Sequence, residues 1–433
     1  MRNYPDAARK PTFPQDAGSL HSAGRTVCVE RMDRSLARTL PAAALLIFSS
    51  LVASLAPSYA DTVPPGAIAL PMTQDSWSEA PPEAWAGKTS ASIKFARYEG
   101  MPSGTMTVNE AVAVSKDARF SSGTIEFDMK PLAYSDTGII FRRQGNDFGE
   151  FVYARANPDC PAADDCIQYA PIVHGRMDWD IYANFEGQAP IAPTGWNHFR
   201  LVVAGDKMLV YVNRQAEPSL VVPRLQGLST DGGIAFKGPA LYANLVLRPG
   251  APEALPGLHE PPPDPGTITA WLTAAPDAFP VDRPVPAADI PPANVWRKLQ
   301  AEPSGLVNLS RAFGSPKAPM PAIGWLKTVI EAASPLQRTL RIGWAREVTV
   351  FLNGKPIFSG DNTYYPEAHR LSPNGRLEPD NASIPLALRQ GKNEIVMAVG
   401  DRWTTGQGNE KLSPYGWGAE AHLDDLTGIT LVQ

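Results

Sequence analysis

Apolar and polar residues alternate in short runs along most of the chain, and no stretch beyond residue 60 shows a long helical period. The runs are rich in β-branched and aromatic residues and are bounded by Gly, Pro, Asn and Asp, a pattern typical of strands joined by turns. In the first half they predict strands at 124–129, 138–143, 150–155, 179–183, 198–204, 208–213, 233–237 and 241–247. Strands at this spacing indicate an antiparallel β-sandwich.

The second half repeats the class of pattern without an obvious sequence match to the first. Strands are predicted at 326–332, 337–344, 347–352, 383–388, 393–400 and 422–432. Asn353-Gly354 separates two apolar runs and predicts a tight hairpin, and Gly391-Lys392 predicts another turn. The expected fold class is therefore all-β, with two tandem antiparallel β-sandwich (jelly-roll) domains.

A proline-rich segment divides the two halves. Residues 249–266 contain Pro249, Pro252, a Pro261–Pro263 run and Pro265, and such a segment cannot join a ladder of strands. It predicts a semi-rigid linker between a first domain at 61–248 and a second at 267–433. A chain of 433 residues is long enough for two domains of this size.

An export signal is predicted before the first domain. Residues 32–38 are basic, 40–55 are almost wholly apolar, and Ser58-Tyr59-Ala60 supplies small residues for cleavage before Asp61. An apolar run of about 16 residues is short for a membrane anchor, which needs about 20. We therefore expect a signal peptide at 32–60, a periplasmic or secreted mature chain without a membrane span, and a disordered, non-native extension at 1–31.

Charge and cysteine content narrow the functional classes. The formal net charge is -5 and basic residues do not cluster, which argues against a nucleic-acid partner. Cys160 and Cys166 are the two cysteines of the mature chain, and in an oxidising compartment they predict a disulfide. No cofactor is predicted, and calcium at Asp159, Asp164 and Asp165 is the alternative to a solvated acidic loop.

Four segments of the first domain carry a family resemblance: SSGTIEFDMKP, DTGIIFRRQ, GWNHFRLVVAGDKMLVYVN and GGIAFKGPALYANLVL. They resemble the concanavalin A-like, laminin G-like jelly rolls and the related 3-keto-disaccharide hydrolase domain. The resemblance covers most of residues 66–248. In the second half, EVTVFLNGKPIFSG and IPLALRQGKNEIVMAVGD resemble galactose-binding-like sandwiches. These resemblances imply a role with sugars by analogy of fold.

A sugar site needs flat apolar faces and polar side chains for the hydroxyl groups. The densest polar and aromatic run of the first domain supplies the candidate ligand residues Arg143, Glu150, Tyr153, Arg155, Gln168, Tyr169, His174 and Trp179. Because strand residues alternate between two faces, only about half of them can share one face. Loop aromatics of the second domain add Tyr365, Trp403 and Trp417, the last expected at a loop tip or packed on a domain.

Catalytic signatures are weak. The strand pattern Glu-x-Asp-x-x-Glu is absent, because Glu126 and Asp128 are not followed by a second Glu, and hydrolysis of a glycosidic bond ordinarily needs two carboxylates. If a reaction occurs, Glu150, His174 and Tyr153 are the candidate catalytic residues. The sequence favours an exported protein that binds oligo- or polysaccharide without catalysis. A glycoside hydrolase or polysaccharide lyase is the first alternative, and an extracellular protein-binding or adhesion module is the second.

Overall fold

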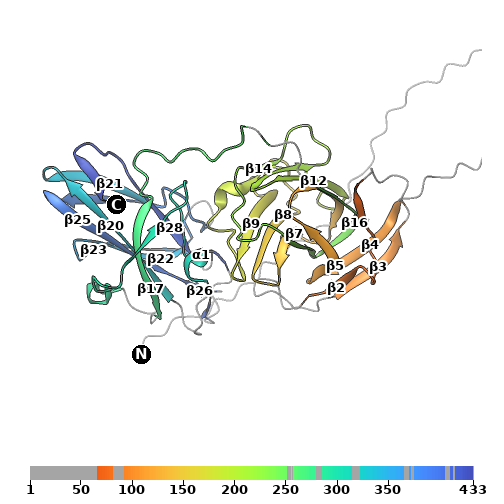
Figure 1. The fold of residues 1–433 in the computed structure, drawn as a ribbon, viewed down its shortest axis with the longest axis horizontal. Coiled ribbons are helices and arrows are strands. Elements are labelled where there is room, and N and C mark those ends of the chain that lie inside the picture. The colour runs from red at the N-terminus through yellow and green to blue at the C-terminus, as the bar shows by residue number, and fades with distance from the viewer. Residues whose placement is uncertain are drawn as a thin grey trace, which may run out of the picture. The chain divides into compact units, whose positions relative to one another are not determined.

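The computed structural model describes residues 66–80, 92–98, 100–250, 255, 257–278, 285–314, 322–364, 370–371, 375–404, 410–412 and 415–432. The predicted extension at 1–31 and the predicted signal peptide at 32–60 lie outside these residues. The described chain is almost entirely β structure, and all its paired strands are antiparallel. The predicted fold class, two tandem antiparallel β-sandwiches, is confirmed (Figure 1).

The first sandwich is built from two eight-stranded sheets. One sheet has the order β14 (Leu220–Val222), β13 (Lys207–Val212), β12 (Asn197–Ala204), β6 (Gly123–Pro131), β16 (Ala240–Pro249), β4 (Met101–Asn109) and β3 (Ser92–Tyr98), with β1 (Ile68–Leu70) beside β16. The other has the order β10 (Arg176–Met177), β9 (Ile167–Val173), β8 (Phe148–Ala154), β7 (Thr137–Gln144), β15 (Gly232–Lys237), β5 (Val112–Phe120) and β2 (Trp77–Glu79), with β11 (Glu186–Gly187) beside β9.

Alternation of buried and half-exposed residues along β6 and β12 places their apolar side chains between the sheets. Phe127 and Phe199 stack there with ring centroids 5.0 Å apart. The strand predicted at 179–183 is wrong. That segment forms a turn followed by the short 3-10 helix η2 (Ala183–Phe185), because side chains of the turn bond to the second sandwich instead of a neighbouring strand.

The second sandwich has a seven-stranded and a four-stranded sheet. The larger has the order β18 (Arg297–Gln300), β17 (Ala270–Ala278), β20 (Ala322–Ala332), β25 (Gly391–Gly400), β22 (Arg346–Leu352) and β23 (Lys355–Asn362), with β29 (Ile429–Val432) beside β20. The smaller has the order β19 (Val307–Asn308), β28 (Gly418–Leu423), β21 (Leu336–Trp344) and β24 (Ala382–Leu388). A single helical turn, α1 (Leu309–Phe313), and the pair β26 (Arg402–Thr404) and β27 (Glu410–Leu412) complete it.

The predicted hairpin of the second sandwich is confirmed. Asn353 and Gly354 have φ of 51° and 72° and join β22 to β23, as a type I′ turn requires. Gly391 also turns the chain, with φ of 83°, but it joins strands of different sheets. The single closing strand predicted at 422–432 is wrong, because the turn at 424–428 divides it into the ends of β28 and β29.

Two buried ion pairs cross between the sandwiches. Arg176 of β10 donates from Nη1 and Nη2 to the two carboxylate oxygens of Asp401, at 2.9 and 2.7 Å. Asp180 accepts from Nη1 of Arg346 at 2.5 Å and from the backbone N–H of Gly416 at 2.8 Å. All four charged side chains are at most 1% exposed. Each sandwich therefore contributes one buried cation and one buried anion to these ion pairs.

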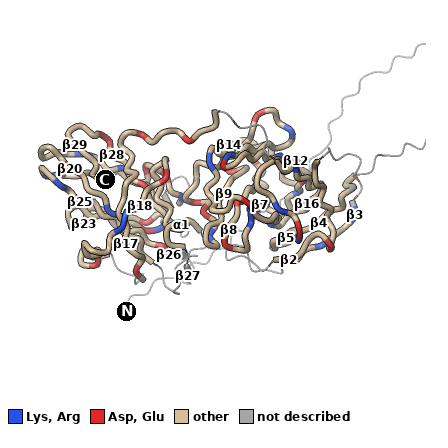
Figure 2. Tube along the Cα trace, in the orientation of Figure 1, with Lys and Arg blue, Asp and Glu red and all other residues tan. Residues whose placement is uncertain are grey.

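Charges elsewhere are dispersed. Lys and Arg alternate with Asp and Glu over the described trace (Figure 2), in line with the absence of a basic cluster in the sequence. Among the described residues, no helix is both long enough and apolar enough to cross a membrane.

We expect Arg176→Gln to lower the free energy of unfolding by about 3–5 kcal/mol, because it leaves the Asp401 carboxylate buried without its partner. The matched control is Arg119→Gln, which breaks an ion pair with Asp231 whose side chains are 67% and 52% exposed and should cost at most about 1 kcal/mol. Urea denaturation of both variants measures the difference. Equal losses in the two variants would contradict a stabilising role for the buried pair.

Candidate ligand-binding site

A cavity of about 270 Å³ lies against the outer face of β8 and β9. The first sandwich contributes the lining residues Tyr134, Asp136, Tyr153, Arg155, Asp165, Met177, Trp179 and Glu186, and the second contributes Tyr364 and Tyr415. Met177 and Tyr415 also form a parallel bridge between the sandwiches. The cavity is thus walled by both sandwiches beside the buried ion pairs.

Strand alternation brings Tyr153 and Gln168 to this face. They are directly opposite each other in the β8–β9 register, and the Tyr153 hydroxyl donates to Oε1 of Gln168 at 2.6 Å. The Gln168 amide donates in turn to the carbonyl of Trp179 at 2.9 Å. Burial raises the pKa of Tyr153, so its hydroxyl stays protonated. This chain of hydrogen bonds fixes the turn that carries Trp179.

Arg155 links the strand face to the rim of the cavity. Its Nη2 donates to Oε1 of Gln168 at 2.9 Å, and its Nη1 donates to Oε2 of Glu186 at 3.1 Å. The other oxygen of Glu186 pairs with Arg376 of the second sandwich at 2.6 Å. Glu186 therefore lies between two guanidinium groups and connects the polar wall of the site to the second sandwich.

Aromatic side chains form the opposite wall. Trp179 contacts Tyr364 and Tyr415 with ring centroids 5.5 and 5.9 Å apart and interplanar angles of 83° and 88°. Such edge-to-face arrangements are favourable for aromatic pairs. The cavity consequently joins a cluster of ring surfaces to a wall of hydrogen-bonding groups.

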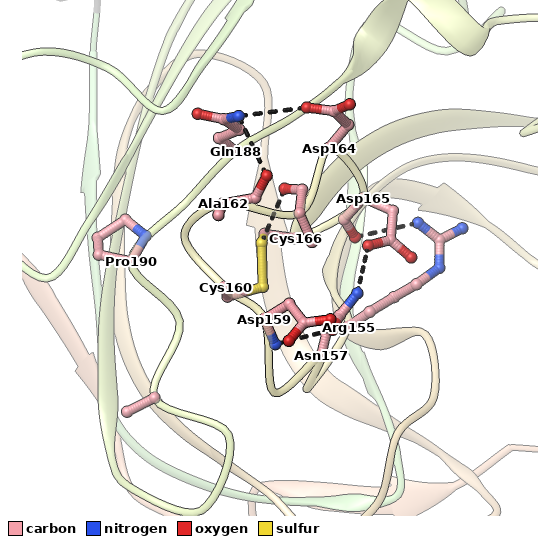
Figure 3. Close-up of a disulfide and its surroundings, with 12 residues drawn as sticks. Arg155, Asn157, Asp159, Cys160, Ala162, Asp164, Asp165, Cys166, Gln188 and Pro190 are labelled. Carbon is pink, nitrogen blue, oxygen red and sulfur yellow. Dashed lines mark hydrogen bonds between the residues drawn. A yellow bond between two sulfur atoms is a disulfide. The ribbon is translucent and has the colours of Figure 1, made fainter. Parts of the chain in front are cut away.

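The predicted disulfide is present and borders the site. Cys160 and Cys166 are bonded with Cα atoms 5.9 Å apart (Figure 3). In the loop that they close, Asp165 accepts from Asn157 at 2.8 Å and from the Tyr134 hydroxyl at 2.9 Å. Burial and the neighbouring Asp165 raise the pKa of Tyr134 to about 12. The loop thereby holds Tyr134 and Asp165 at the cavity.

The alternative prediction of calcium in this loop gains no support. Asp164 accepts from Gln188 at 3.2 Å, and Asp165 faces Asn157 (Figure 3). Asp165 also accepts from the Tyr134 hydroxyl. Within the part of the chain that the structure describes, no group of three or more His, Cys, Asp or Glu side chains could hold a metal ion. The side chains of Asp164 and Asp165 accept hydrogen bonds from residues outside the loop.

Three of the predicted ligand residues line this cavity, Tyr153, Arg155 and Trp179, and Gln168 supports all three through hydrogen bonds. Glu150 and Tyr169 do not line it, because their positions on β8 and β9 face the interior of the first sandwich. The Tyr169 hydroxyl donates to Oε2 of Glu150 at 2.6 Å and accepts from the backbone N–H of Gln226 at 2.6 Å. Glu150 is only 1% exposed, so its side chain lies in the core of the first sandwich and away from this cavity.

The remaining first-domain candidates lie away from the cavity lining. Arg143 donates to Oδ1 of Asn146 at 2.5 Å near the end of β7. His174 follows β9 at the opposite end from Arg155 and packs against Phe148, with ring centroids 5.0 Å apart. Neither lines the cavity. The structure therefore separates His174 and Tyr153, two of the three predicted catalytic residues.

Of the three candidate residues of the second domain, the structure describes the side chain of Trp417 alone. Trp417 is fully buried, and its indole N–H donates to the carbonyl of Val399 at 3.1 Å, so it is packed on a domain, the second of its two predicted placements. Small glycine neighbours, read as marks of a loop tip, instead allow close approach to the core. Tyr365 lies outside the described residues, and nothing is described of the Trp403 side chain.

Several residues that line the cavity were not predicted as ligand-binding residues: Tyr134, Asp136, Met177, Glu186, Tyr364 and Tyr415. Asp165 was predicted only as a calcium ligand. Arg376, which pairs with Glu186, was not predicted. Tyr364 and Tyr415 lie in loops whose aromatic content was noted in the sequence. Asp136 and Glu186 lie outside the polar run that was singled out, and their convergence depends on the strand pairing of β7, β8, β9 and β11.

No protein-family model and no curated protein matches the sequence. Solved structures with a similar fold include the carbohydrate-binding module CBM66 from Bacillus subtilis (14% identity, 40% of this chain and 95% of that chain, TM-score 0.29). Others are domain 4 of a GH43 extracellular arabinanase from Geobacillus stearothermophilus (12%, 40% and 82%, TM-score 0.27) and a β-1,3-glucanase from Mycobacterium marinum (12%, 41% and 92%, TM-score 0.24). Identities and scores this low assign neither a ligand nor an activity to this chain.

The buried Glu150 makes the free energy of unfolding depend on pH. Burial raises its pKa from 4.5 to about 7, against the lowering effects of Tyr169 and Arg142. The folded state then holds a proton that the unfolded state has lost. The stability that this proton contributes is complete below pH 4.5 and is lost as the pH rises to 7.

We expect Glu150→Gln to remove this loss, so the difference in free energy of unfolding between variant and wild type should shift by up to about 3 kcal/mol between pH 4.5 and 7. Urea denaturation across this pH range measures it. Because other buried acids titrate in both proteins, the difference isolates Glu150. Parallel pH profiles for variant and wild type would disprove the raised pKa.

Proposed function

We propose that this protein is exported and binds an oligo- or polysaccharide in the cavity between Trp179, Arg155 and Tyr364. The single observation that carries the proposal is the pairing of ring surfaces with charged and polar groups in one cavity. A pyranose ring offers apolar faces for stacking and hydroxyl groups for hydrogen bonds, and this combination matches it. We propose further that the domains span 61–248 and 267–433, joined by the linker at 249–266.

The polar wall is suited to hydroxyl groups because both kinds of partner are present. Asp136, Asp165 and Glu186 accept hydrogen bonds, while Arg155 and Tyr134 donate them. Most of these groups are already held by neighbours, as Asp136 is by Lys237 at 2.9 Å. A prearranged site loses less conformational entropy on binding. The sugar would therefore meet donors and acceptors that need little rearrangement.

Export is supported by residues 32–60 and by the disulfide. Structural disulfides persist in oxidising compartments and are rare in the cytosol. Cys160 and Cys166 are bonded in a loop that borders the proposed site. A periplasmic or secreted location would preserve that loop and bring the site into contact with external glycans.

A glycan-active enzyme is the second candidate, favoured by three carboxylates on one cavity: Asp136, Asp165 and Glu186. Hydrolysis requires one carboxyl group to act as an acid and another as base or nucleophile. Glu186 lies between the guanidinium groups of Arg155 and Arg376. Binding without bond cleavage is the better-supported function, and product formation is the outcome that separates the two.

We expect Tyr364→Ala to weaken binding of the best oligosaccharide from a panel at least tenfold, because it removes a ring from the aromatic wall. The matched control is Tyr211→Ala, which truncates a tyrosine on β13 of the opposite sheet and should leave affinity within twofold. Isothermal titration calorimetry measures binding, and chromatography of the same mixtures detects products. Equal loss in both variants would refute this site, and new sugar products would favour the enzyme.

A further inference from the structure

A second cavity, of about 170 Å³, lies between η2 of the first sandwich and the outer face of β28 of the second. Its charged lining residues are all carboxylates: Glu260, Glu302, Glu378 and Glu420. Tyr182 and Phe185 lie buried on one side, while Asn184, Ser304 and Pro379 are exposed at the rim. The cavity is therefore acidic, partly aromatic and open to solvent.

Three of the four carboxylates have a basic group nearby: Arg376 acts on Glu378, and Glu302 and Glu260 form ion pairs. Glu302 pairs with Arg311 at 2.9 Å and accepts from the Tyr182 hydroxyl at 2.6 Å. Glu260 pairs with Arg224 at 3.5 Å. Their charges are thus largely compensated within the protein, and they contribute acceptors more than net charge.

Glu420 differs from them. It is 8% exposed, and its Oε1 has no hydrogen-bond partner among the described residues. The charged groups that act on it most strongly are Glu378, Asp380 and Glu302, all negative. A buried acceptor without a partner is uncommon in native proteins and requires an explanation, such as a bound ion.

The strand fixes the position of this carboxylate. Ala419 and Ala421 face the core of the second sandwich, so Glu420 between them faces outward. It is opposite Gly343 in the β21–β28 register, where a Cβ atom would come within 2.9 Å of its Oε1. Gly343 therefore leaves room for the Glu420 side chain to lie along the sheet. Glu420 lies between this cavity and a neighbouring cavity that it also lines.

We propose that this cavity binds the ammonium group of a small organic cation, with Glu420 as its counter-ion. The stacked rings of Tyr182 and Phe185, 5.9 Å apart at 18°, offer surface that attracts an ammonium group. A metal ion is disfavoured, because no group of three or more potential ligands occurs among the residues described. The site is independent of the proposed sugar cavity.

The affinity for an ammonium ion should depend on pH. Burial, together with Glu378, Asp380 and Glu302, raises the pKa of Glu420 to about 8, so the cation competes with a proton. The neighbouring cavity that Glu420 also lines has three more charged or titratable residues in its lining: Asp264, Arg341 and His422. Burial and Arg341 lower the pKa of His422 below 6.5, so His422 is neutral where Glu420 titrates. Affinity should then rise about tenfold per pH unit up to pH 8 and level off above it.

Titration of the purified chain with n-butylammonium chloride from pH 6 to 9, followed by calorimetry, tests the proposal. The probe stays charged throughout, because a primary amine has a pKa near 10.4. We expect Glu420→Gln to bind at least tenfold more weakly at pH 8.5 and to lose the pH dependence, with an unchanged or higher Tm. Glu331→Gln, on an exposed residue of β20, is the matched control and should behave as wild type.

Glucosamine and neutral N-acetylglucosamine, compared with n-butylammonium at pH 7, where the amine of glucosamine is still mostly protonated, identify the source of the ammonium group. Tighter binding of glucosamine than of n-butylammonium indicates an amino sugar, and binding of n-butylammonium alone indicates an aliphatic amine. No binding of either cation, or unchanged binding of both cations by Glu420→Gln, would overturn the proposal. A sugar held in the oligosaccharide cavity would bind Glu420→Gln as tightly as wild type, so this variant separates the two sites.

Discussion

The exchange of buried charges between the two sandwiches is the interaction on which the rest of the structure depends. Arg176 enters the second sandwich to meet Asp401, and Arg346 meets Asp180 of the first. A buried ion is costly unless it is paired and hydrogen-bonded. In either sandwich alone, these charged groups would be exposed to solvent or buried without a partner. The ion pairs therefore determine how the two sandwiches pack together more than they add to the free energy of unfolding.

Local backbone geometry serves this arrangement. Arg346 has φ of 81°, a left-handed conformation that costs a non-glycine residue about 1–3 kcal/mol. Gly416 approaches Asp180 so closely that a Cβ atom would lie 2.6 Å from its Oδ1. These features are explained by the need to bring a guanidinium group and a backbone N–H to one carboxylate. The same features bring Tyr415 next to Trp179 at the cavity.

The shared boundary has a consequence for function. Two sandwiches with independent surfaces could act as separate binding modules. Here the polar wall of the larger cavity belongs to the first sandwich, while Tyr364, Tyr415 and Arg376 come from the second. In our proposal the second sandwich completes a site on the first.

Strand periodicity, turn chemistry and the two cysteines were sufficient to predict many of the strands, the hairpin at Asn353-Gly354 and the disulfide, because these depend on local sequence, but not β3, β4, β5, β9 or β17. The cavity was predicted only in part. Tyr153, Arg155 and Gln168 lie on neighbouring strands, but the parity that separates Tyr153 from Glu150 is set by strand pairing. The sequence left the placement of Trp417 open, because flanking glycines occur at loop tips and also where a chain packs closely on a core. Glu186 and Arg376 meet only through tertiary contacts.

A crystal structure of the protein with a bound oligosaccharide would test the central claim most directly. Our account places a sugar ring against Trp179, Tyr364 and Tyr415, with its hydroxyl groups directed toward Arg155 and Glu186. Electron density for the sugar on either sandwich alone, away from these residues, would contradict a site completed by both.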